Sequence, residues 1–465
     1  MNFDLEMVAR ITDGEVSSGA ANCSLTGIST DSRNLKPGEL FVPLRGARFD
    51  GHDYLILAVR NGAAACLSEE VVAGLPVPVI RVADTLHALG DLAAANRLSL
   101  RGPLVGITGS AGKTTTKEML ATILEQQGAG LKTAGNFNNL IGLPLTLLQL
   151  KPEHRWAVIE MGTSSLGEIE RLTEIAAPNI GVITNVGPAH LETLQGLAGV
   201  ARAKGELFAG LRGGTAIVNL DDERVARLPI ANGVRKIGYG LQDGAEVRGL
   251  NVKAGAESVE FTLVLASGSY LVKLQAPGQH NVSNALAAAA TAEALGIPAE
   301  LIVSGLEAFQ QIPGRMNLSP MPGGGILLDD SYNANPMSVA AALKILRLQE
   351  GVGRKVAVLG DMLELGDGAS KMHQEIGGQA AENADLLIAV GSFAADICSG
   401  AETAGMSRDQ MIETASCDEA IEQILQRQRS GDCILVKGSR GVQLDKLAAA
   451  LQSQENNIKP EEQEG

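Results

Sequence analysis

Short runs of apolar residues alternate along the chain with stretches in which apolar residues recur every three or four positions. The short runs predict buried strands, and the spaced residues predict amphipathic helices. In the middle and final thirds of the chain this alternation has the β-α-β rhythm of parallel sheets covered by helices. The strands expected there comprise residues 104–107, 156–159, 180–184, 326–329, 355–359, 385–390 and 433–436.

The pattern predicts an α/β protein of three domains followed by a polar tail. Residues 1–100 form an N-terminal α/β domain, and residues 101–313 a central parallel-sheet domain with a β-rich insertion at 215–275. Residues 314–452 form a C-terminal, doubly wound domain of the Rossmann-like kind, and residues 453–465 are expected to be disordered. The 465 residues exceed what one hydrophobic core usually supports, which agrees with several domains.

Residues 104–116, LVGITGSAGKTTT, place a glycine-rich turn between a strand and a helix. Gly109 and Gly112 permit close backbone approaches, and the amides at the helix N-terminus favour phosphate oxygens. Lys113 can reach the terminal phosphates, and the Thr114 hydroxyl can bind Mg²⁺. The strict pattern has another glycine two positions before Gly109, so the motif is a variant, and a bare glycine-rich turn is the alternative. We interpret the turn as a P-loop-type site for a nucleotide with Mg²⁺.

Charge and cysteine content limit the classes of partner. The formal net charge of -15 argues against nucleic acid, and it requires local groups to hold any anionic ligand. The five cysteines lack CxxC or zinc spacing, and the N-terminus lacks the pattern of a signal peptide, so we expect a reducing cytoplasm. No apolar run approaches the roughly 18 residues that would span a bilayer, so stable membrane insertion is not expected.

Several polar residues follow predicted strands, where ligands bind in open parallel sheets. Glu160 and His190 are expected at the same sheet edge as Lys113, although a helix cap and a structural histidine are the ordinary roles of such residues. Asn281 and Asn284 lie one helical turn apart on one face. Four polar strand ends in the third domain, at 330–336, 360–362, 391–392 and 437–440, predict a second ligand-binding face.

The motifs occur in the order TGSAGKTT, GNFNNLIGLPLT, VIEMG, TNVGPAHLE, ARAKGELF, PGQHNVSNALAA, IPGRM, DDSYNANP and VLGDMLELG. This order resembles that of the Mur ligases, the ATP-dependent amide-forming enzymes of peptidoglycan synthesis, and it extends to STDSR and LRGARFDGHDY near the start. Within the family, DDSYNANP and GNFNN resemble the members that add D-alanyl-D-alanine to UDP-N-acetylmuramoyl-tripeptide. The resemblance implies domains for the UDP-substrate, ATP and the amino-acid substrate respectively, and we expect a monomer.

The resemblance also implies roles for individual residues, including a carbamoylated Lys204 that would hold Mg²⁺ near the γ-phosphate. The implied catalytic residues are Lys113, Lys204 and His190. The implied metal ligands are Thr114, Glu160, His190 and Lys204. The implied ATP contacts are Thr108, Gly109, Ser110, Ala111, Gly112, Lys113, Thr114, Thr115, Asn281, Asn284, Arg315 and Asp330. The implied substrate contacts are Ser32, Arg33, Arg48, Asn136, Asn138, Asn139, Asn333, Asn335 and Asp361.

Some features leave alternatives open. The charge pattern alone predicts that Arg33 and Arg48 lie on a solvated surface, because nearby acidic residues offset their positive charges. Leu140 and Thr163 depart from the family pattern, which has a polar or acidic residue and alanine there. A folylpolyglutamate synthetase-like ligase would carry a DGAHNP-like run in place of DDSYNANP, and a sister Mur ligase that adds a diamino acid would carry DNPR. A non-catalytic nucleotide-dependent switch would bind ATP without substrate-stimulated phosphate release.

Overall fold

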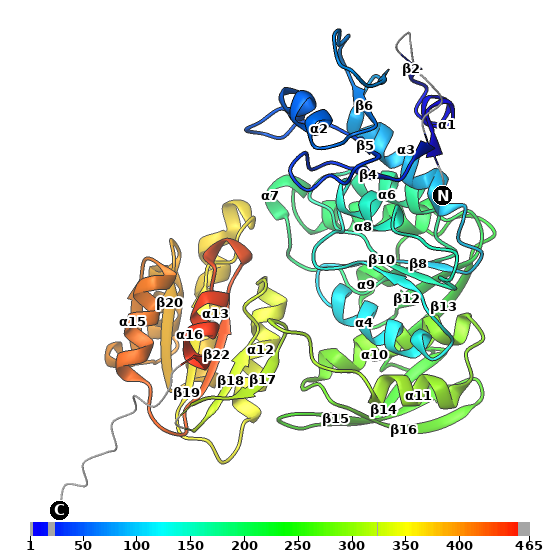
Figure 1. The fold of residues 1–465 in the computed structure, drawn as a ribbon. Coiled ribbons are helices and arrows are strands. Elements are labelled where there is room, and N and C mark those ends of the chain that lie inside the picture. Colours follow the sequence, from blue (N-terminus) through cyan, green and yellow to red (C-terminus); the bar gives the residue numbers. More distant parts are fainter. Residues whose placement is uncertain (1–2, 17–23, 323, 454–465) are drawn as a thin grey trace, which may run out of the picture.

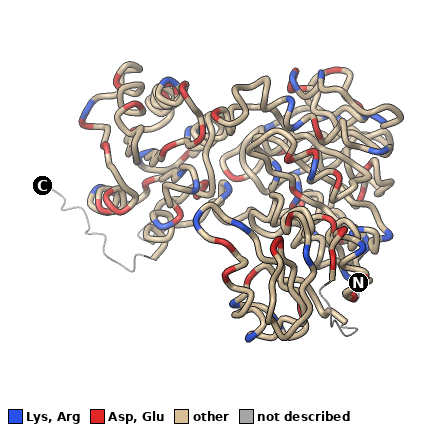
Figure 2. The backbone as a smooth tube through the Cα atoms, turned by 90° about the horizontal axis from the view of Figure 1, so that it is seen from above, with Lys and Arg blue, Asp and Glu red and all other residues tan. Residues whose placement is uncertain are grey.

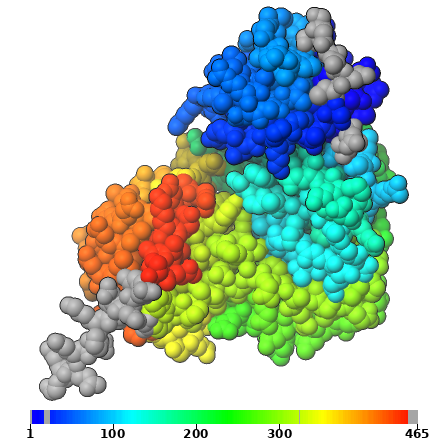
Figure 3. Space-filling model, viewed as in Figure 1, coloured from blue at the N-terminus to red at the C-terminus, as the bar shows by residue number. Residues whose placement is uncertain are grey.

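A computed structural model describes residues 3–16, 24–322 and 324–453, and these residues build three main sheets (Figure 1). Each sheet lies within one of the three segments expected from the sequence. In Figure 3 the first domain sits on top of the central domain, and the third domain lies beside it. The predicted α/β fold class is confirmed, while the expected tail from residue 454 onward lies outside the described residues.

The first domain contains a five-stranded sheet with helix α3 (Thr85–Arg97) at its end toward the central domain. Its strands pair in parallel except at β2, which is antiparallel to β7. The sheet order is β2 (Glu15–Val16), β7 (Val79–Arg81), β6 (Ala65–Ser68), β5 (Glu39–Phe41) and β4 (Gly27–Ser29).

The central domain is organised around one nine-stranded sheet. Its strands run in parallel from β9 to β14, and β15 and β16 are antiparallel. The residues expected as a β-rich insertion therefore continue the central sheet. The order is β16 (Gly268–Leu274), β15 (Val259–Leu265), β14 (Val247–Ala254), β13 (Arg235–Gly240), β12 (Thr215–Asn219), β11 (Ile180–Ile183), β8 (Leu104–Thr108), β10 (Ala157–Glu160) and β9 (Leu131–Lys132).

Helices cover both faces of the central sheet. On one face α4 (Lys113–Glu125), α10 (Gln279–Ala294) and α11 (Ala299–Glu307) share a hydrophobic core with the strands. On the other face α6 (Glu168–Ala176) and α8 (Leu197–Gly210) pack in a second core. Seven of the sixteen residues of α10 are alanine, and six of these are fully buried, so their small side chains let α4 and the sheet approach closely.

The third domain contains a six-stranded sheet that is parallel except at β17. Helices α12 (Pro336–Leu348), α13 (Ala369–Asn383) and α14 (Ala394–Thr403) cover one face, and α15 (Cys417–Arg427) and α16 (Asp445–Gln452) cover the other. The order is β17 (Asn317–Pro320), β18 (Ile326–Asp329), β22 (Cys433–Lys437), β19 (Lys355–Gly360), β20 (Leu386–Val390) and β21 (Met411–Thr414).

Basic and acidic residues are interspersed along the backbone, with no large stretch of one sign (Figure 2). This distribution agrees with the expectation that anionic ligands are held by local groups rather than by an overall field. None of the helices in the described ranges combines the length and the apolar character that crossing a lipid bilayer requires.

A buried arginine joins the first domain to the central domain. Arg97, at the end of α3, donates from Nε to the Ala176 carbonyl at 2.9 Å and from Nη2 to the Asn179 side-chain oxygen at 3.1 Å. Asn179 Oδ1 also accepts from the main-chain amide of Leu104, the first residue of β8, at 2.9 Å. The guanidinium therefore joins α3 of the first domain to the end of α6 and, through Asn179, to the first residue of β8.

Replacement of Arg97 by leucine is expected to lower the free energy of unfolding by about 2–4 kcal/mol, because it leaves buried acceptors without a donor. Urea unfolding of both proteins measures the change. Arg101→Ala, at an exposed position of the linker, is the control and should unfold like the wild type. Equal stability of Arg97→Leu and the control would contradict this account.

Candidate active site

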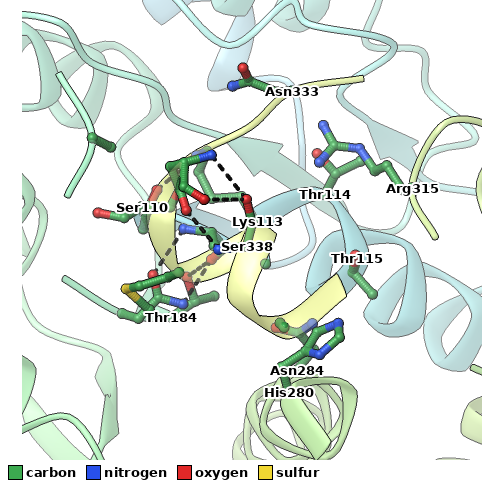
Figure 4. A pocket seen from close by; sticks show the side chains of 18 of the residues that line it. Ser110, Lys113, Thr114, Thr115, Thr184, His280, Asn284, Arg315, Asn333 and Ser338 are labelled. Carbon is green, nitrogen blue, oxygen red and sulfur yellow. Dashed lines mark hydrogen bonds between the residues drawn. The ribbon is translucent and has the colours of Figure 1, made fainter. Parts of the chain in front are cut away.

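A cavity of about 1360 Å³ lies between the central and third domains. Its walls contain the phosphate loop, the residues that follow β10 and β11, the first turn of α10, and segments of the third domain. Single small-molecule sites usually occupy about 300–1,000 Å³, so this cavity has room for more than one ligand. Figure 4 shows Lys113 and Thr114 of the central domain and Arg315 and Asn333 of the third domain around this pocket.

The phosphate loop has the backbone geometry that its glycines predict. Gly109 and Gly112 have φ of 153° and 82°, and Gly112 is the N-cap of α4. A Cβ at Gly109 would lie 1.8 Å from Thr184 Oγ1, and one at Gly112 would lie 2.2 Å from Asn284 Oδ1. Both positions therefore require glycine for space as well as for torsion, and the loop leaves the amides at the start of α4 available to an anion.

Lys113 extends along the phosphate loop and donates from Nζ to the Gly109 carbonyl at 2.7 Å. Burial lowers the pKa of Lys113; the nearby Glu160 carboxylate opposes this shift and Arg315 adds to it. A cation held away from water interacts strongly with an anion placed beside it. The cavity thus presents a desolvated positive charge next to the loop that would cradle phosphates.

Glu160 ends β10 and is joined to the phosphate-loop helix. Thr114 Oγ1 donates to Glu160 Oε2, and Asn138 Nδ2 donates to Glu160 Oε1, both at 2.9 Å. No group of three or more His, Cys, Asp or Glu side chains with metal-binding geometry occurs in the described ranges. The hydroxyl and carboxylate oxygens of Thr114 and Glu160 nevertheless suit Mg²⁺, which commonly takes one or two protein ligands together with phosphate oxygens and water.

His190 and Lys204 flank this group. His190 Nδ1 contacts the carboxylate of Glu364 from the third domain. Lys204 is only 3% exposed, and its ammonium has no hydrogen-bond or ion-pair partner among the residues described. Burial, with a smaller effect of Lys113, lowers the pKa of Lys204 well below its ordinary value. Lys204 is therefore a buried amine whose surroundings favour the neutral form.

The predicted ATP contacts farther along the chain lie on the same cavity. Asn284 Nδ2 donates to Asn281 Oδ1 at 3.1 Å, so the two asparagines do share one face of α10. The Arg315 guanidinium stacks on the Tyr332 ring, 4.2 Å from its centroid. Asp330 accepts from the buried Lys437 ammonium. The central and third domains therefore contribute jointly to this part of the site.

The predicted substrate residues divide into two groups. Those that line the cavity are Asn136, Asn138, Asn139, Asn333 and Asn335. The cavity is not lined by Ser32, Arg33, Arg48 or Asp361.

Local contacts occupy two of the residues outside the cavity. Asp361 instead accepts from the main-chain amides of Ser392 and Phe393 at 2.8 and 2.9 Å, a role that organises the loop after β20. Arg33 pairs with Asp31 at 2.9 Å on the surface of the first domain, as the charge pattern alone suggested.

Two further cavity residues, Lys437 and Arg440, belong to the strand end 437–440 that the sequence predicted as part of a second ligand-binding face. Asn185 was not among the predicted contacts, although it lies two residues after β11, so the rule that ligands bind at strand ends contained the signal for it. Glu364 lies in the loop after β19, and only the docking of the third domain brings it to His190.

Comparison with known protein families gives three matches along the chain. The family described as Mur ligase family, catalytic domain, matches residues 24–97; the Mur ligase middle domain matches 107–292; and the Mur ligase, glutamate ligase domain, matches 314–440. A relative from Escherichia coli strain K12, UDP-N-acetylmuramoyl-tripeptide–D-alanyl-D-alanine ligase, is 39% identical over 97% of this chain and 99% of its own. The chain belongs to the Mur ligase family. The resemblance predicted from the sequence is thereby confirmed, and the chain is an ATP-dependent ligase.

Further Mur ligases agree in sequence and structure. The Bacillus subtilis strain 168 protein of the same name is 36% identical over 91% of this chain and 93% of its own. A crystal structure of MurF from Acinetobacter baumannii has a TM-score of 0.90 at 35% identity, covering 98% of this chain and 99% of that one. MurF ligase from Thermotoga maritima in complex with ADP has a TM-score of 0.80 at 28% identity, covering 92% and 97%.

Proposed function

We propose that this Mur ligase joins D-alanyl-D-alanine to UDP-N-acetylmuramoyl-tripeptide and converts ATP to ADP and phosphate. The observation that carries the proposal is the end-to-end similarity to relatives that bear the name of this reaction, at up to 39% identity. The cavity adds physical support, because it combines a phosphate loop with a polar wall from a second domain and has room for several ligands.

The proposed reaction has two steps. In the first, the terminal carboxylate of the tripeptide attacks the γ-phosphorus of ATP, the bond to the bridging oxygen breaks, and an acyl phosphate and ADP form. In the second, the neutral amine of the dipeptide attacks the acyl carbon, phosphate leaves, and the amine loses its proton. An α-amine has an ordinary pKa of about 8, so a useful fraction is neutral at pH 7 without a dedicated strong base.

Residues of the central domain would stabilise the first step. The amides at the start of α4 would hold phosphate oxygens, and the Lys113 ammonium would offset the charge that spreads over the transferring phosphoryl group. Lys113 lies beside the loop already, so little rearrangement is required of it. Thr114 and Glu160, with His190, would hold Mg²⁺, which when bound supplies Lewis-acid stabilisation to the phosphate oxygens.

We further propose that Lys204 is carbamoylated. Its lowered pKa raises the fraction of neutral amine, the form that reacts with carbon dioxide, and its burial would protect the product. The carbamate would replace an unpartnered buried amine by an anion with two hard oxygens. That anion would favour the charged form of Lys113 and add metal-binding oxygens to a site that has few carboxylates.

The third domain would position the acceptor and exclude water. Asn333 faces the cavity, while the main-chain carbonyl of Asn333 is held by Lys437 Nζ at 3.0 Å. The third domain also contacts the central domain through His190 and Glu364 and through Gln349 Nε2, which donates to the Ala256 carbonyl at 3.0 Å. Such docking would protect an acyl phosphate from hydrolysis.

The location and the oligomeric state are also proposals. The four described cysteines, Cys66, Cys398, Cys417 and Cys433, are free and buried, as suits a reducing compartment. We propose a cytoplasmic enzyme that works as a monomer, since the central and third domains of a single chain together line the cavity. Sedimentation at micromolar concentration would test the monomer.

Acceptor selection tests the proposal. UDP-N-acetylmuramoyl-tripeptide with D-alanyl-D-alanine is expected to stimulate phosphate release at least about 100-fold more than the tripeptide with D-alanine, which lacks the amide bond of the dipeptide and carries its carboxylate one residue closer to the amine. Diamino acids with UDP-muramoyl-dipeptide, and L-glutamate with folate, should stimulate little. A coupled phosphate assay compares the pairs. If folate with L-glutamate were the best pair, the substrate assignment would fail while the ligase chemistry survived.

A further inference from the structure

The segment that follows β11, residues 184–187, lies against the tip of the phosphate loop. Thr184 Oγ1 donates to the Ala111 carbonyl at 2.6 Å. Ser110 Oγ donates to the Gly187 carbonyl and accepts from the Gly187 amide, both at 2.9 Å. The loop and this segment are thus joined although they are more than 70 residues apart in sequence.

Asn185 makes the most complete set of these contacts. Its side-chain amide donates from Nδ2 to the Ala111 carbonyl at 3.0 Å and accepts at Oδ1 from the Ala111 amide at 2.9 Å. Its main-chain carbonyl accepts from the Ser110 amide at 3.1 Å. Asn185 therefore pairs with both polar groups of one loop residue and with the amide of the residue before it.

These contacts leave the amides at the start of α4 free. Lys113 and Thr114 open α4, and the first amides of a helix have no acceptor within it. The residues that are tied, Ser110 and Ala111, lie just before Gly112. Glycine-rich segments lose much conformational entropy on ordering, so a loop that is already held in shape binds its ligand at a lower entropic cost.

The third domain contacts the same unit. Asn335 Nδ2, at the N-cap of α12, donates to the Ser110 carbonyl at 3.3 Å. Met337, in the first turn of α12, packs so closely on Gly187 that a Cβ there would lie 1.9 Å from its sulfur. Loop shape and domain docking therefore depend on the same pair of residues, Ser110 and Gly187.

We propose that Asn185 is a positioning residue that preforms the phosphate loop for nucleotide, with Thr184 as its second anchor. The inference rests on the proposed nucleotide site. Asn185 acts through the main chain of Ser110 and Ala111, so its loss lets the loop adopt shapes that cannot receive phosphates while the sheet and both neighbouring domains remain folded.

Calorimetric titration of ADP into Asn185→Ala tests the inference without relying on turnover. The expected result is an ADP dissociation constant raised at least about tenfold, with the thermal midpoint and the affinity for UDP-N-acetylmuramoyl-tripeptide close to those of the wild type. Asn232→Ala, at an exposed turn of the central domain, is the matched control and should bind ADP like the wild type.

Thr184→Val is the second variant, because it is similar in size and replaces by a methyl group the buried hydroxyl that donates to the Ala111 and Thr108 carbonyls. Thr184→Val is also expected to raise the ADP dissociation constant, and it tests the inference if Asn185→Ala fails to fold. Unchanged ADP affinity in the folded variants overturns the inference alone. If the wild type itself fails to bind ADP, the proposed nucleotide site is overturned as well.

Discussion

Replacement of Lys113 by alanine is expected to reduce turnover by about 1,000-fold or more in a protein that folds normally. The side chain supplies the desolvated cation beside the phosphate loop, and its one hydrogen bond goes to the Gly109 carbonyl rather than to the core. Loss of a charge that stabilises the moving phosphoryl group acts mainly on the transition state. Steady-state phosphate release with saturating substrates measures the effect.

The control for this variant is Lys236→Ala, at an exposed position of β13. It changes the net charge equally, so it corrects for long-range electrostatics, and it should retain wild-type turnover. Thermal unfolding should show both variants folded. Near-normal turnover in folded Lys113→Ala would contradict the proposed nucleotide site.

Replacement of Lys204 by alanine is expected to reduce activity on the order of 100-fold or more, and a small added carboxylate should restore part of it. Alanine vacates a buried space beside Lys113, and a free carboxylate placed there would supply the oxygens that the carbamate is proposed to supply. The measurement is turnover as a function of acetate or formate concentration.

Rescue distinguishes a functional anion from a structural lysine. The same carboxylates should leave the wild type and Lys113→Ala unimproved, since neither has a vacated anion site. A folded Lys204→Ala protein with unchanged activity and no response to carboxylate would show that Lys204 needs no modification.

The sequence predicted the interior of the sheets better than their edges. The strands β18, β19, β20 and β22 are continuous apolar runs, because both of their faces are covered by helices. The edge strand β17 has the sequence NLSP, and the edge strand β21 reads MIET; neither contains a long apolar run. Whether such a segment forms an edge strand depends on the strand with which it pairs. The local pattern of apolar residues does not reveal that partner strand.

Some features of the candidate site depend on residues that are close together in the sequence, and others depend on residues that are far apart. The phosphate loop was predicted because its glycines, lysine and hydroxyl occur within a few residues. The link between Ser110 and Gly187 depends on the pairing of β8 with β11. The contact between His190 and Glu364 depends on the position of a whole domain. Asp361 follows a strand as a ligand-binding residue would, but neighbouring amides occupy its carboxylate.

The most direct test of the central claim is a reaction that contains the wild-type protein, ATP, Mg²⁺, UDP-N-acetylmuramoyl-tripeptide and D-alanyl-D-alanine, analysed by mass spectrometry. The account predicts one UDP-N-acetylmuramoyl-pentapeptide for each phosphate released, and neither product when the tripeptide or the dipeptide is omitted. Phosphate release that is equal with and without these two substrates, with no pentapeptide formed, would contradict the account and favour a nucleotide-dependent switch.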